Sequence, residues 1–282
     1  MKVINFGSLN IDLVYRVHEF ARPGETVPAL SFSRFAGGKG LNQSIALARA
    51  GAPTLHAGAV GEDGNFLLET LRESGVDCSA VEVDAIAPSG HAVIQVADSG
   101  ENVIVLFPGT NHRISHELIR KALSQAEAGD ILLLQNEISA IPEIIREAAD
   151  RQMRIFFNPA PMTSAVRDYP LNSVDTLIVN ETEYDALKPY RLPDGINVLK
   201  TLGARGAVYN DTIQVAAKRV DKVVDTTAAG DTFIGYFIAE LLQNRSIETA
   251  METASVASAW CIQRSGAAVS IPWRRDLPSA EK

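Results

Sequence analysis

The sequence predicts an α/β fold in which a doubly wound, mainly parallel sheet is flanked by helices and a small β-sheet forms a lid. Three observations predict it. After residue 130, short apolar runs alternate with helical stretches, as in the β-α units of a parallel sheet. Before residue 110, two segments alternate apolar with polar residues, which is typical of half-exposed strands. With 282 residues and 46% hydrophobic content, the chain suffices for one large domain with a sizeable core.

The N-terminal half contains a first strand and then the lid. The chain enters a strand within residues 1–7, and this apolar run is too short for a signal peptide. Residues 29–35 and 91–107 carry the alternating pattern, and the second segment turns back around residues 98–101 as a hairpin. Both segments flank the glycines near residue 38. We therefore expect a small sheet over a cleft, although an edge hairpin of the main sheet would give the same pattern.

The expected organisation is a single domain over residues 1–282. The lid strands lie within about 13–36 and 89–110, as insertions in the α/β core. The chain contains no repeats, low-complexity tracts or long linkers that would divide it further.

Polar residues follow the apolar runs of the C-terminal half. The runs at 131–134, 155–157 and 177–179 read as strands, with a helical stretch at 141–149 after the first. Because open α/β sheets gather their ligands at the carboxyl ends of their strands, these polar ends predict a shared site. Ordinary turn chemistry is the alternative. The polar ends are Asn136-Glu137, Asn158-Pro159, Asn180-Glu181 and Thr201.

The composition argues against several classes of function. The 34 acidic and 26 basic residues give a formal charge of -8 without any basic run, which argues against nucleic acids and anionic membranes as partners. Cys78 and Cys261 lie far apart without metal-ligand spacing, so neither a disulfide framework nor a zinc site is expected. No apolar run approaches the ~20 residues of a membrane span. We expect a cytoplasmic protein.

Residues 225–233 combine the features of a phosphate site. A strand is expected to end at residues 223–224, and a helix to begin near the small residues 228–230, where no side chain blocks its first N–H groups. These N–H groups and the helix dipole favour a bound phosphate. Asp231 in the first turn would then take the proton of an attacking hydroxyl. Alternatively, it only caps the helix.

A glycine-rich stretch at residues 36–43 predicts a second binding loop. It lacks the Ser or Thr of a Walker A loop and the third glycine of a dinucleotide fingerprint, which argues against a nicotinamide-dependent oxidoreductase. Its glycines instead let a small ligand approach the backbone, while Lys39 and Asn42 offer side-chain donors. We expect a helix to begin near Asn42.

Asn10 and Asp12 follow the first strand at a spacing that points both side chains the same way. A carboxylate accepts two hydrogen bonds and an amide both donates and accepts, which suits the vicinal hydroxyls of a polyol. A turn stabilised by these side chains is the alternative.

Together these motifs resemble the ribokinase-like (PfkB) family of carbohydrate kinases over nearly the full chain. Several are individually weak, but their joint order is specific. The family fold is a doubly wound α/β core with a β lid. The motifs are Gly-Ser-x-Asn-x-Asp at 7–12, Pro-Gly-Glu-Thr at 23–26, Gly-Gly-Lys-Gly-x-Asn-Gln at 37–43, Gly-Glu-Asn at 100–102, Asn-Pro-Ala-Pro at 158–161, Asn-Glu-Thr-Glu at 180–183, Thr-Leu-Gly at 201–203, and residues 225–233.

The resemblance implies transfer of the γ-phosphate of Mg-ATP to a primary hydroxyl of a pentose, with D-ribose foremost and D-ribose 5-phosphate as the product. It makes Asp231 the general base and implies an anion hole from the N–H groups of Ala228, Ala229, Gly230 and Asp231. The matching sugar positions are Asn10, Asp12, Gly38, Lys39, Asn42, Glu137 and Asp231, covered by the apolar lid positions Ala92, Ile94 and Leu106.

The resemblance also implies a nucleotide site, two metals and a homodimer formed through the lid. Glu183 matches the position associated indirectly with magnesium. The nucleotide positions are Asn180, Thr201, Gly203, Gly206, Gly230 and Ser255, and the positions for an activating potassium ion are Asp225, Thr227, Cys261, Arg264, Gly266 and Ser270.

Two departures from the family pattern bear on nucleotide binding. The chain is short between Glu183 and Thr201, where a peripheral helix or strand is missing, and Ser255 replaces the His or Asn common near the adenine. The acceptor alternatives are 2-deoxyribose, a ketohexose or a nucleoside. A non-catalytic sugar or nucleotide sensor on the same fold is the alternative from another class.

Overall fold

A computed structural model of the protein describes residues 1–278, so residues 279–282 of the predicted domain lie outside the described part. The main sheet has the strand order β13-β12-β11-β10-β9-β8-β1-β4-β5 and is parallel except at the β11-β12 and β12-β13 pairs. Its strands are β1 (Val3–Phe6), β4 (Thr54–Gly61), β5 (Asp77–Asp84), β8 (Ile131–Gln135), β9 (Arg154–Asn158), β10 (Thr176–Asn180), β11 (Asn197–Thr201), β12 (Ala207–Tyr209) and β13 (Ile213–Val215).

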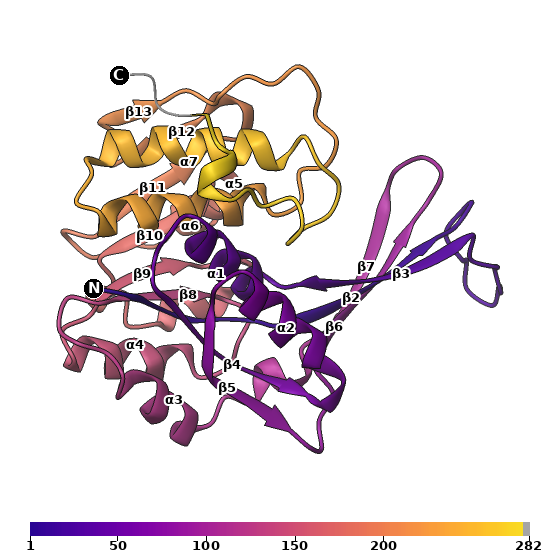
Figure 1. Ribbon diagram of the computed structural model, residues 1–282, viewed down its shortest axis with the longest axis horizontal. Coiled ribbons are helices and arrows are strands. Elements are labelled where there is room, and N and C mark those ends of the chain that lie inside the picture. Colours follow the sequence, from indigo (N-terminus) through magenta and orange to yellow (C-terminus); the bar gives the residue numbers. More distant parts are fainter. Residues whose placement is uncertain (279–282) are drawn as a thin grey trace.

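Helices cover both faces of this sheet (Figure 1). Within β8, Leu132 and Leu134 pack into a core with α3 and α4, while Ile131 and Leu133 pack into a second core with α6 and α7. Burial on both faces explains why the strand is continuously apolar. The helices are α1 (Lys39–Arg49), α2 (Asn65–Glu73), α3 (His116–Leu123), α4 (Ile141–Asp150), α5 (Glu181–Leu187), α6 (Ala229–Leu242) and α7 (Ile247–Cys261).

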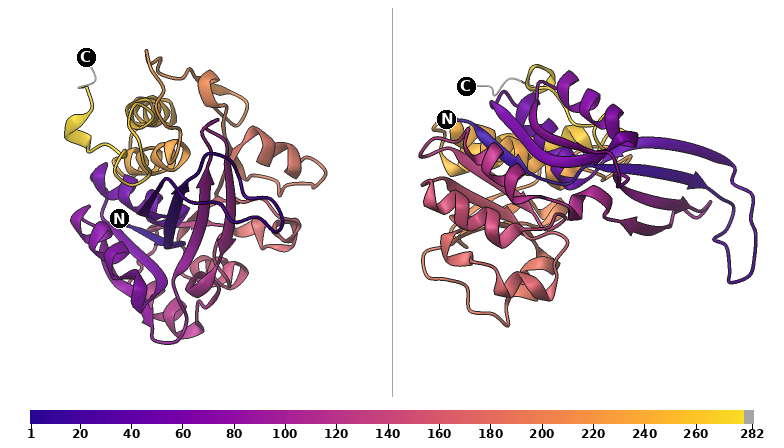
Figure 2. Two further views of the ribbon diagram at one scale, coloured as in Figure 1. Left: turned by 90° about the vertical axis from the view of Figure 1, so that its right-hand side faces the viewer. Right: turned by 90° about the horizontal axis from the view of Figure 1, so that it is seen from below.

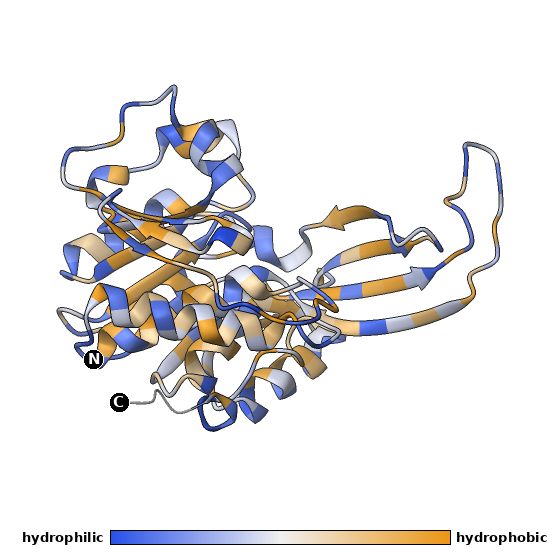
Figure 3. Ribbon diagram, turned by 90° about the horizontal axis from the view of Figure 1, so that it is seen from above, coloured by the Kyte–Doolittle hydropathy of each residue, from blue (hydrophilic) through white to orange (hydrophobic). Residues whose placement is uncertain are grey.

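The second sheet has the order β3-β2-β6-β7 and projects from one side of the core (Figures 1 and 2). Its strands are β2 (Asn10–Arg16), β3 (Ser31–Gly37), β6 (Gly90–Val96) and β7 (Asn102–Phe107). β2 and β6 run parallel in the centre, and both edge strands are antiparallel to their neighbours. Figure 3 shows hydrophobic and hydrophilic residues interspersed along these strands. The predicted fold class, a doubly wound core with a separate small sheet, is confirmed.

Two local predictions were wrong. Residues 223–224 do not end a strand: Val223 and Val224 lie exposed in an irregular segment, because β13 pairs only with β12 and offers no neighbour to them. The helix expected near Asn42 begins earlier, at Lys39. It starts directly after Gly38, whose φ of 96° lets β3 turn into α1.

Among the helices of residues 1–278, none has both the length and the apolar composition that crossing a membrane requires.

Candidate active site

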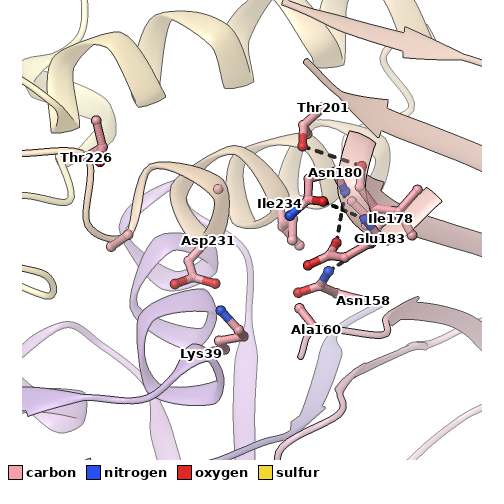
Figure 4. A pocket seen from close by; sticks show the side chains of 13 residues that line it. Lys39, Asn158, Ala160, Ile178, Asn180, Glu183, Thr201, Thr226, Asp231 and Ile234 are labelled. Atoms are coloured by element: carbon pink, nitrogen blue, oxygen red, sulfur yellow. Dashed lines mark hydrogen bonds between the residues drawn. The ribbon is translucent and has the colours of Figure 1, made fainter. Parts of the chain in front are cut away.

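A cavity of about 250 Å³ lies at the carboxyl ends of β9, β10 and β11, beside the start of α6 (Figure 4). The strand ends Asn158, Asn180 and Thr201 all reach it, as their positions after neighbouring strands predict. Asn136 does not, because its amide donates to the carbonyl of Pro161. The remaining lining residues are Lys39, Ala160, Ile178, Val179, Glu183, Thr226, Ala228, Gly230, Asp231 and Ile234.

The start of α6 is open toward this cavity. Ala228 precedes the helix in the left-handed conformation, with a φ of 60° and no side-chain cap. A Cβ added at Gly230 would meet no atom within 4 Å, so nothing covers the first turn there. The N–H of Ala229 donates to the carbonyl of Thr226 at 3.2 Å, whereas within residues 1–278 the N–H groups of Gly230 and Asp231 have no backbone partner. Such free donors, backed by the helix dipole, suit an anion.

The carboxylate of Asp231 is held by two side-chain amides from α1. Its Oδ1 accepts a hydrogen bond from Gln43 Nε2 at 2.9 Å, and its Oδ2 accepts one from Asn42 Nδ2 at 3.1 Å. Asp231 therefore turns toward α1 rather than capping its own helix. Asn42 Oδ1 is buried without a partner and remains available to a ligand hydroxyl.

Lys39 faces Asp231 across the cavity, and the two side chains point toward each other in Figure 4. Burial alone would lower the pKa of Lys39, but the negative charges of Asp231, Glu137 and Glu183 raise it above its usual value. The side chain is therefore a fixed cation. A phosphate that enters this cavity meets it directly.

Glu137 lies under the start of α1. Its Oε2 accepts from the N–H of Lys39 at 3.0 Å and from the hydroxyl of Ser8. Burial raises the pKa of Glu137 above its usual range, although the charge of Lys39 opposes this shift. Glu137 thus joins the end of β8 to the glycine-rich loop.

Asn10 and Asp12 open β2 on the small-sheet side of the site. Asn10 Oδ1 accepts from Asn111 Nδ2 at 2.7 Å, which fixes the orientation of the Asn10 amide. Burial, and then the charge of Glu137, raises the pKa of Asp12 to about 6. A Cβ at Gly37 would lie 2.1 Å from Asp12 Oδ2, so only glycine leaves room for this carboxylate.

The predicted apolar lid positions share a face of the small sheet with Asp12. Ala92 pairs with Asp12 on one side and with Leu106 on the other, and Ile94 follows two residues further along β6. Residues opposite one another on neighbouring strands project from the same face of a sheet. Ala92 is buried, while Leu106 is 52% exposed.

The predicted nucleotide positions fall into two groups. Asn180 and Glu183 form a capping box at the start of α5, in which each side chain accepts from the other residue's N–H at 2.8 Å. Together with Thr201 and Gly230 they line the cavity. Gly203 and Gly206 shape the turn after β11, where a Cβ at Gly206 would lie 2.0 Å from the carbonyl oxygen of Val215.

Ser255 lies apart from the other nucleotide positions. Its hydroxyl accepts from the N–H of Lys218 at 2.8 Å and so ties the segment after β13 to α7. It lines a second cavity of about 680 Å³, which shares no lining residue with the first. No helix or strand lies between the end of α5 and the start of β11, where the chain was expected to be short.

The predicted potassium positions meet behind the start of α6. Asp225 Oδ1 accepts from the N–H of Thr227 at 2.9 Å, and its Oδ2 accepts from the N–H of Gly266 at 2.9 Å. Burial acts to raise the pKa of Asp225, but these hydrogen bonds lower it overall. Cys261 and Ser270 are in contact at 3.0 Å. The guanidinium of Arg264 lies 4.6 Å from the Trp260 ring centroid and so is engaged away from Asp225.

Sequence reasoning assigned no individual role to Gln43 or Thr226 and placed Asn158 at the shared site only as a strand end, although all three lie at the site. The available signals were that Gln43 adjoins Asn42 in the glycine-rich motif, that Asn158 ends a strand, and that Thr226 precedes the predicted helix. None of these signals reveals a partner distant in the sequence.

Comparison with known proteins gives consistent matches. The model of the family described as pfkB family carbohydrate kinase matches residues 1–274. Ribokinase of Haemophilus influenzae is 32% identical over 294 residues, which cover 96% of this chain and 95% of that protein. Ribokinase from Cryptococcus neoformans in complex with ADP has a TM-score of 0.87 at 31% identity, over 98% of both chains. Ribokinase from Arabidopsis thaliana complexed with ribose and ATP has a TM-score of 0.85 at 29% identity, over 97% of this chain and 96% of that one.

Proposed function

The chain belongs to the pfkB family of carbohydrate kinases, and from that premise we propose that it phosphorylates a primary hydroxyl of a pentose with Mg-ATP. The leading acceptor is D-ribose, which gives D-ribose 5-phosphate. One observation carries the proposal: Asn42 and Gln43 fix the Asp231 carboxylate beside an open helix start and a cavity of about 250 Å³. The Cryptococcus and Arabidopsis ribokinases, solved with ADP and with ribose and ATP, support the same choice of substrates.

In the proposed mechanism, Asp231 takes the proton of the sugar hydroxyl as that hydroxyl attacks the γ-phosphorus. Positioned base catalysis supplies typically ~10²–10⁴-fold in rate. The free N–H groups of Gly230 and Asp231, with the ammonium of Lys39, stabilise the charge that develops on the transferred group. Lys39 thereby serves the phosphate as well as the sugar. Asn10, Asp12 and Glu137 hold the sugar from the other side.

The donor set fits magnesium bound together with ATP. Glu183 lines the cavity, and its Oε2 is already engaged by the N–H of Asn180, which suits an indirect, water-mediated role. Bound with the nucleotide, magnesium would neutralise charge on the phosphates.

The loop behind α6 fits a potassium ion. Asp225 Oδ1 accepts two hydrogen bonds from Thr227 and Oδ2 accepts one from Gly266, so Oδ2 keeps a lone pair for the ion. We expect potassium to increase kcat by ordering the cradle, which is the loop and the first turn of α6 at residues 225–231. Turnover measured in potassium, sodium and tetramethylammonium chloride at constant ionic strength tests this, and equal rates in all three salts would refute it.

We further propose a cytoplasmic homodimer formed through the small sheet. Cys78 and Cys261 are free thiols, as a reducing compartment favours. The edge strand β7 pairs only with β6, and its apolar residues 103–107 are exposed. A second copy that covered them would bury an edge otherwise prone to association.

The first test compares the wild-type protein with Asp231→Asn. We expect kcat to fall by ~10²–10⁴-fold, because the amide cannot accept the proton. Calorimetric titration with D-ribose should show that sugar binding is retained. Asp221→Asn, in the exposed segment before the cradle, serves as the control and should keep full turnover. A variant Asp231→Asn that retained more than about a tenth of the rate would contradict the assignment.

A substrate panel distinguishes the alternatives. Release of ADP with D-ribose, 2-deoxyribose, fructose and adenosine identifies the acceptor, since a site that pairs a hydroxyl discriminates strongly against an analogue lacking it. If the protein bound ligands but phosphorylated none of the acceptors, the non-catalytic sensor would be favoured.

A further inference from the structure

We propose that Gln43 and Gln135 are positioning residues that orient the Asp231 carboxylate through a relay of buried amides. The proposal rests on the role of Asp231 as the base in the proposed function. Gln43 Nε2 donates to Asp231 Oδ1 at 2.9 Å, and Gln43 Oε1 accepts from Gln135 Nε2 at 2.7 Å. Gln43 and Gln135 are both fully buried, and Gln135 makes no contact with Asp231.

Asn5 lies at the far end of the relay, and its orientation is set by the carbonyl oxygen of Gly40, which can only accept hydrogen bonds. Asn5 Nδ2 donates to the carbonyl oxygen of Gly40 at 2.9 Å, so Asn5 must present its oxygen in the opposite direction. That oxygen accepts from Gln135 Nε2 at 2.9 Å. The nitrogen of Gln135 therefore also faces Gln43, and the oxygen of Gln43 is engaged by it.

Asn158 fixes the orientation of the Gln43 amide independently of Gln135. Asn158 Nδ2 donates to the carbonyl oxygen of Ile178 at 2.8 Å, which turns Asn158 Oδ1 toward Gln43. Gln43 Nε2 donates to that oxygen at 3.3 Å as well as to Asp231. Both anchors thus require the nitrogen of Gln43, not its oxygen, to face the carboxylate.

These contacts fix the orientation of the Asp231 carboxylate. Gln43 engages Oδ1 and Asn42 engages Oδ2, so the plane of the carboxylate is fixed while each oxygen keeps a free lone pair for the acceptor hydroxyl. Without Gln135, only the longer contact with Asn158, at 3.3 Å, still opposes rotation of the Gln43 amide, so its oxygen would face Asp231 more often and repel the carboxylate. Misplacing a reacting group by about 1 Å can cost ~10²-fold in rate.

The experiment compares Gln43→Met, Gln135→Met and the double variant. We expect kcat of Gln43→Met to fall by ~10–10²-fold, with the KM values for sugar and ATP unchanged, because Gln43 contacts the base and neither substrate. Gln135→Met should show a smaller fall of the same kind. Because Gln135 acts only through Gln43, the double variant should be no slower than Gln43→Met alone.

Thr54→Val is the control. Thr54 is buried, and its hydroxyl donates to the carbonyl of Ala52 rather than to any member of the relay. We expect loss of this hydrogen bond to lower the midpoint of thermal unfolding while kcat stays at the wild-type value. Should Gln43→Met fail to fold, Gln43→Asn, which keeps an amide but withdraws it from Asp231 by one methylene, carries the same test and the same expected loss of kcat.

Three outcomes would overturn the proposal: an unchanged kcat in the Gln43 variants, losses that multiply in the double variant, or an equal loss in Thr54→Val. Each of these leaves the proposed base intact if Asp231→Asn is inactive. If Asp231→Asn were itself active, the proposed function would fail first, so the two failures are distinguishable.

Discussion

Asp12, which we propose binds the sugar, destabilises the folded protein in the absence of a ligand. Its carboxylate is buried beside Glu137, and burial is the larger cause of its raised pKa of about 6. In an unfolded chain the same group titrates at its ordinary value of 3.8. Between these two pH values the folded state binds more protons than the unfolded state, so stability falls as the pH rises through this window.

We therefore expect Asp12→Asn to stabilise the free protein at pH 7, by ~1–3 kcal/mol. The gain should largely vanish by about pH 3, below both pKa values, where Asp12 is protonated in the folded and the unfolded state. Urea unfolding at the two pH values measures it. Sugar binding should weaken in the same variant, because an amide accepts fewer hydrogen bonds than a carboxylate.

Asp84 provides a control of opposite sign. The N–H groups of Ala87 and Ile86, and then Arg113, lower the pKa of Asp84 to about 2. Its contribution to stability is present above pH 3.8 and is lost as the pH falls through about 2. Asp84→Asn should therefore destabilise the protein at pH 7. If both variants changed stability in the same direction, the argument from Asp12 would be wrong.

At the scale of residues, motif and chemistry alone nominate Asp231, Lys39 and Asp12, and the first two line the cavity. Each carries a distinctive group in a distinctive local pattern. The contact of Gln43 with Asp231 is not predictable in this way, since 188 residues separate the pair. Only the packing of α1 against α6 brings them together.

At the scale of elements, the start of α6 is locally unfavourable: one residue has a strained backbone conformation and another has a low helix propensity. Ala228 adopts a left-handed conformation, which costs a non-glycine residue roughly 1–2 kcal/mol. Gly230 sits in the first turn, where alanine would be the better helix former. Both choices keep the first N–H groups of α6 uncovered.

We expect Gly230→Ala to stabilise the protein by ~0.5–1 kcal/mol, because its Cβ would meet open space. The same methyl group would stand in the cradle, so kcat/KM for ATP should fall. Thermal unfolding and steady-state kinetics check the two effects. Gly235→Ala is the contrasting variant: its Cβ would lie 2.4 Å from that of Ala46, so it should be destabilised. Unchanged kinetics in Gly230→Ala would contradict the open cradle.

The pattern of elements in the C-terminal half was predictable because its strands are buried on both faces and its helices carry apolar stripes. Residues 223–224 show the limit of such reasoning. Two valines favour a strand locally, but a strand needs a neighbour to pair with, and the sheet ends at β13. The early start of α1 likewise depends on a backbone turn at Gly38 that no side-chain pattern reveals.

At the scale of the whole molecule, the small sheet is joined to the core at the end of β1, the start of α1, the end of β5 and the 3-10 helix Gly109–His112. Its exposed edge strand β7 carries five consecutive apolar residues, from Val103 to Phe107, each between 46% and 65% exposed. An uncovered edge of this kind favours pairing with another chain.

We expect light scattering after size exclusion to give the mass of a dimer, and Val105→Lys to give that of a monomer with a raised KM for the sugar. A lysine on an edge strand opposes strand pairing. Val83→Lys is the matched control, since Val83 is 51% exposed on β5, the edge strand of the main sheet. A wild-type monomer, or a dimer that survives Val105→Lys, would exclude this interface.

Gly235 leaves α1 and α6 in close contact, because any side chain there would strike Ala46 and the N–H of Leu47. The helix that carries Lys39 and Asn42 and the helix that carries Asp231 are thus locked together. The residues proposed for phosphoryl transfer therefore lie on one closely packed pair of helices, whereas the apolar residues proposed to cover the sugar belong to a separate sheet. Under the proposed function, altering Ala92, Ile94 or Leu106 should change the acceptor while Asp231 and the start of α6 keep their geometry.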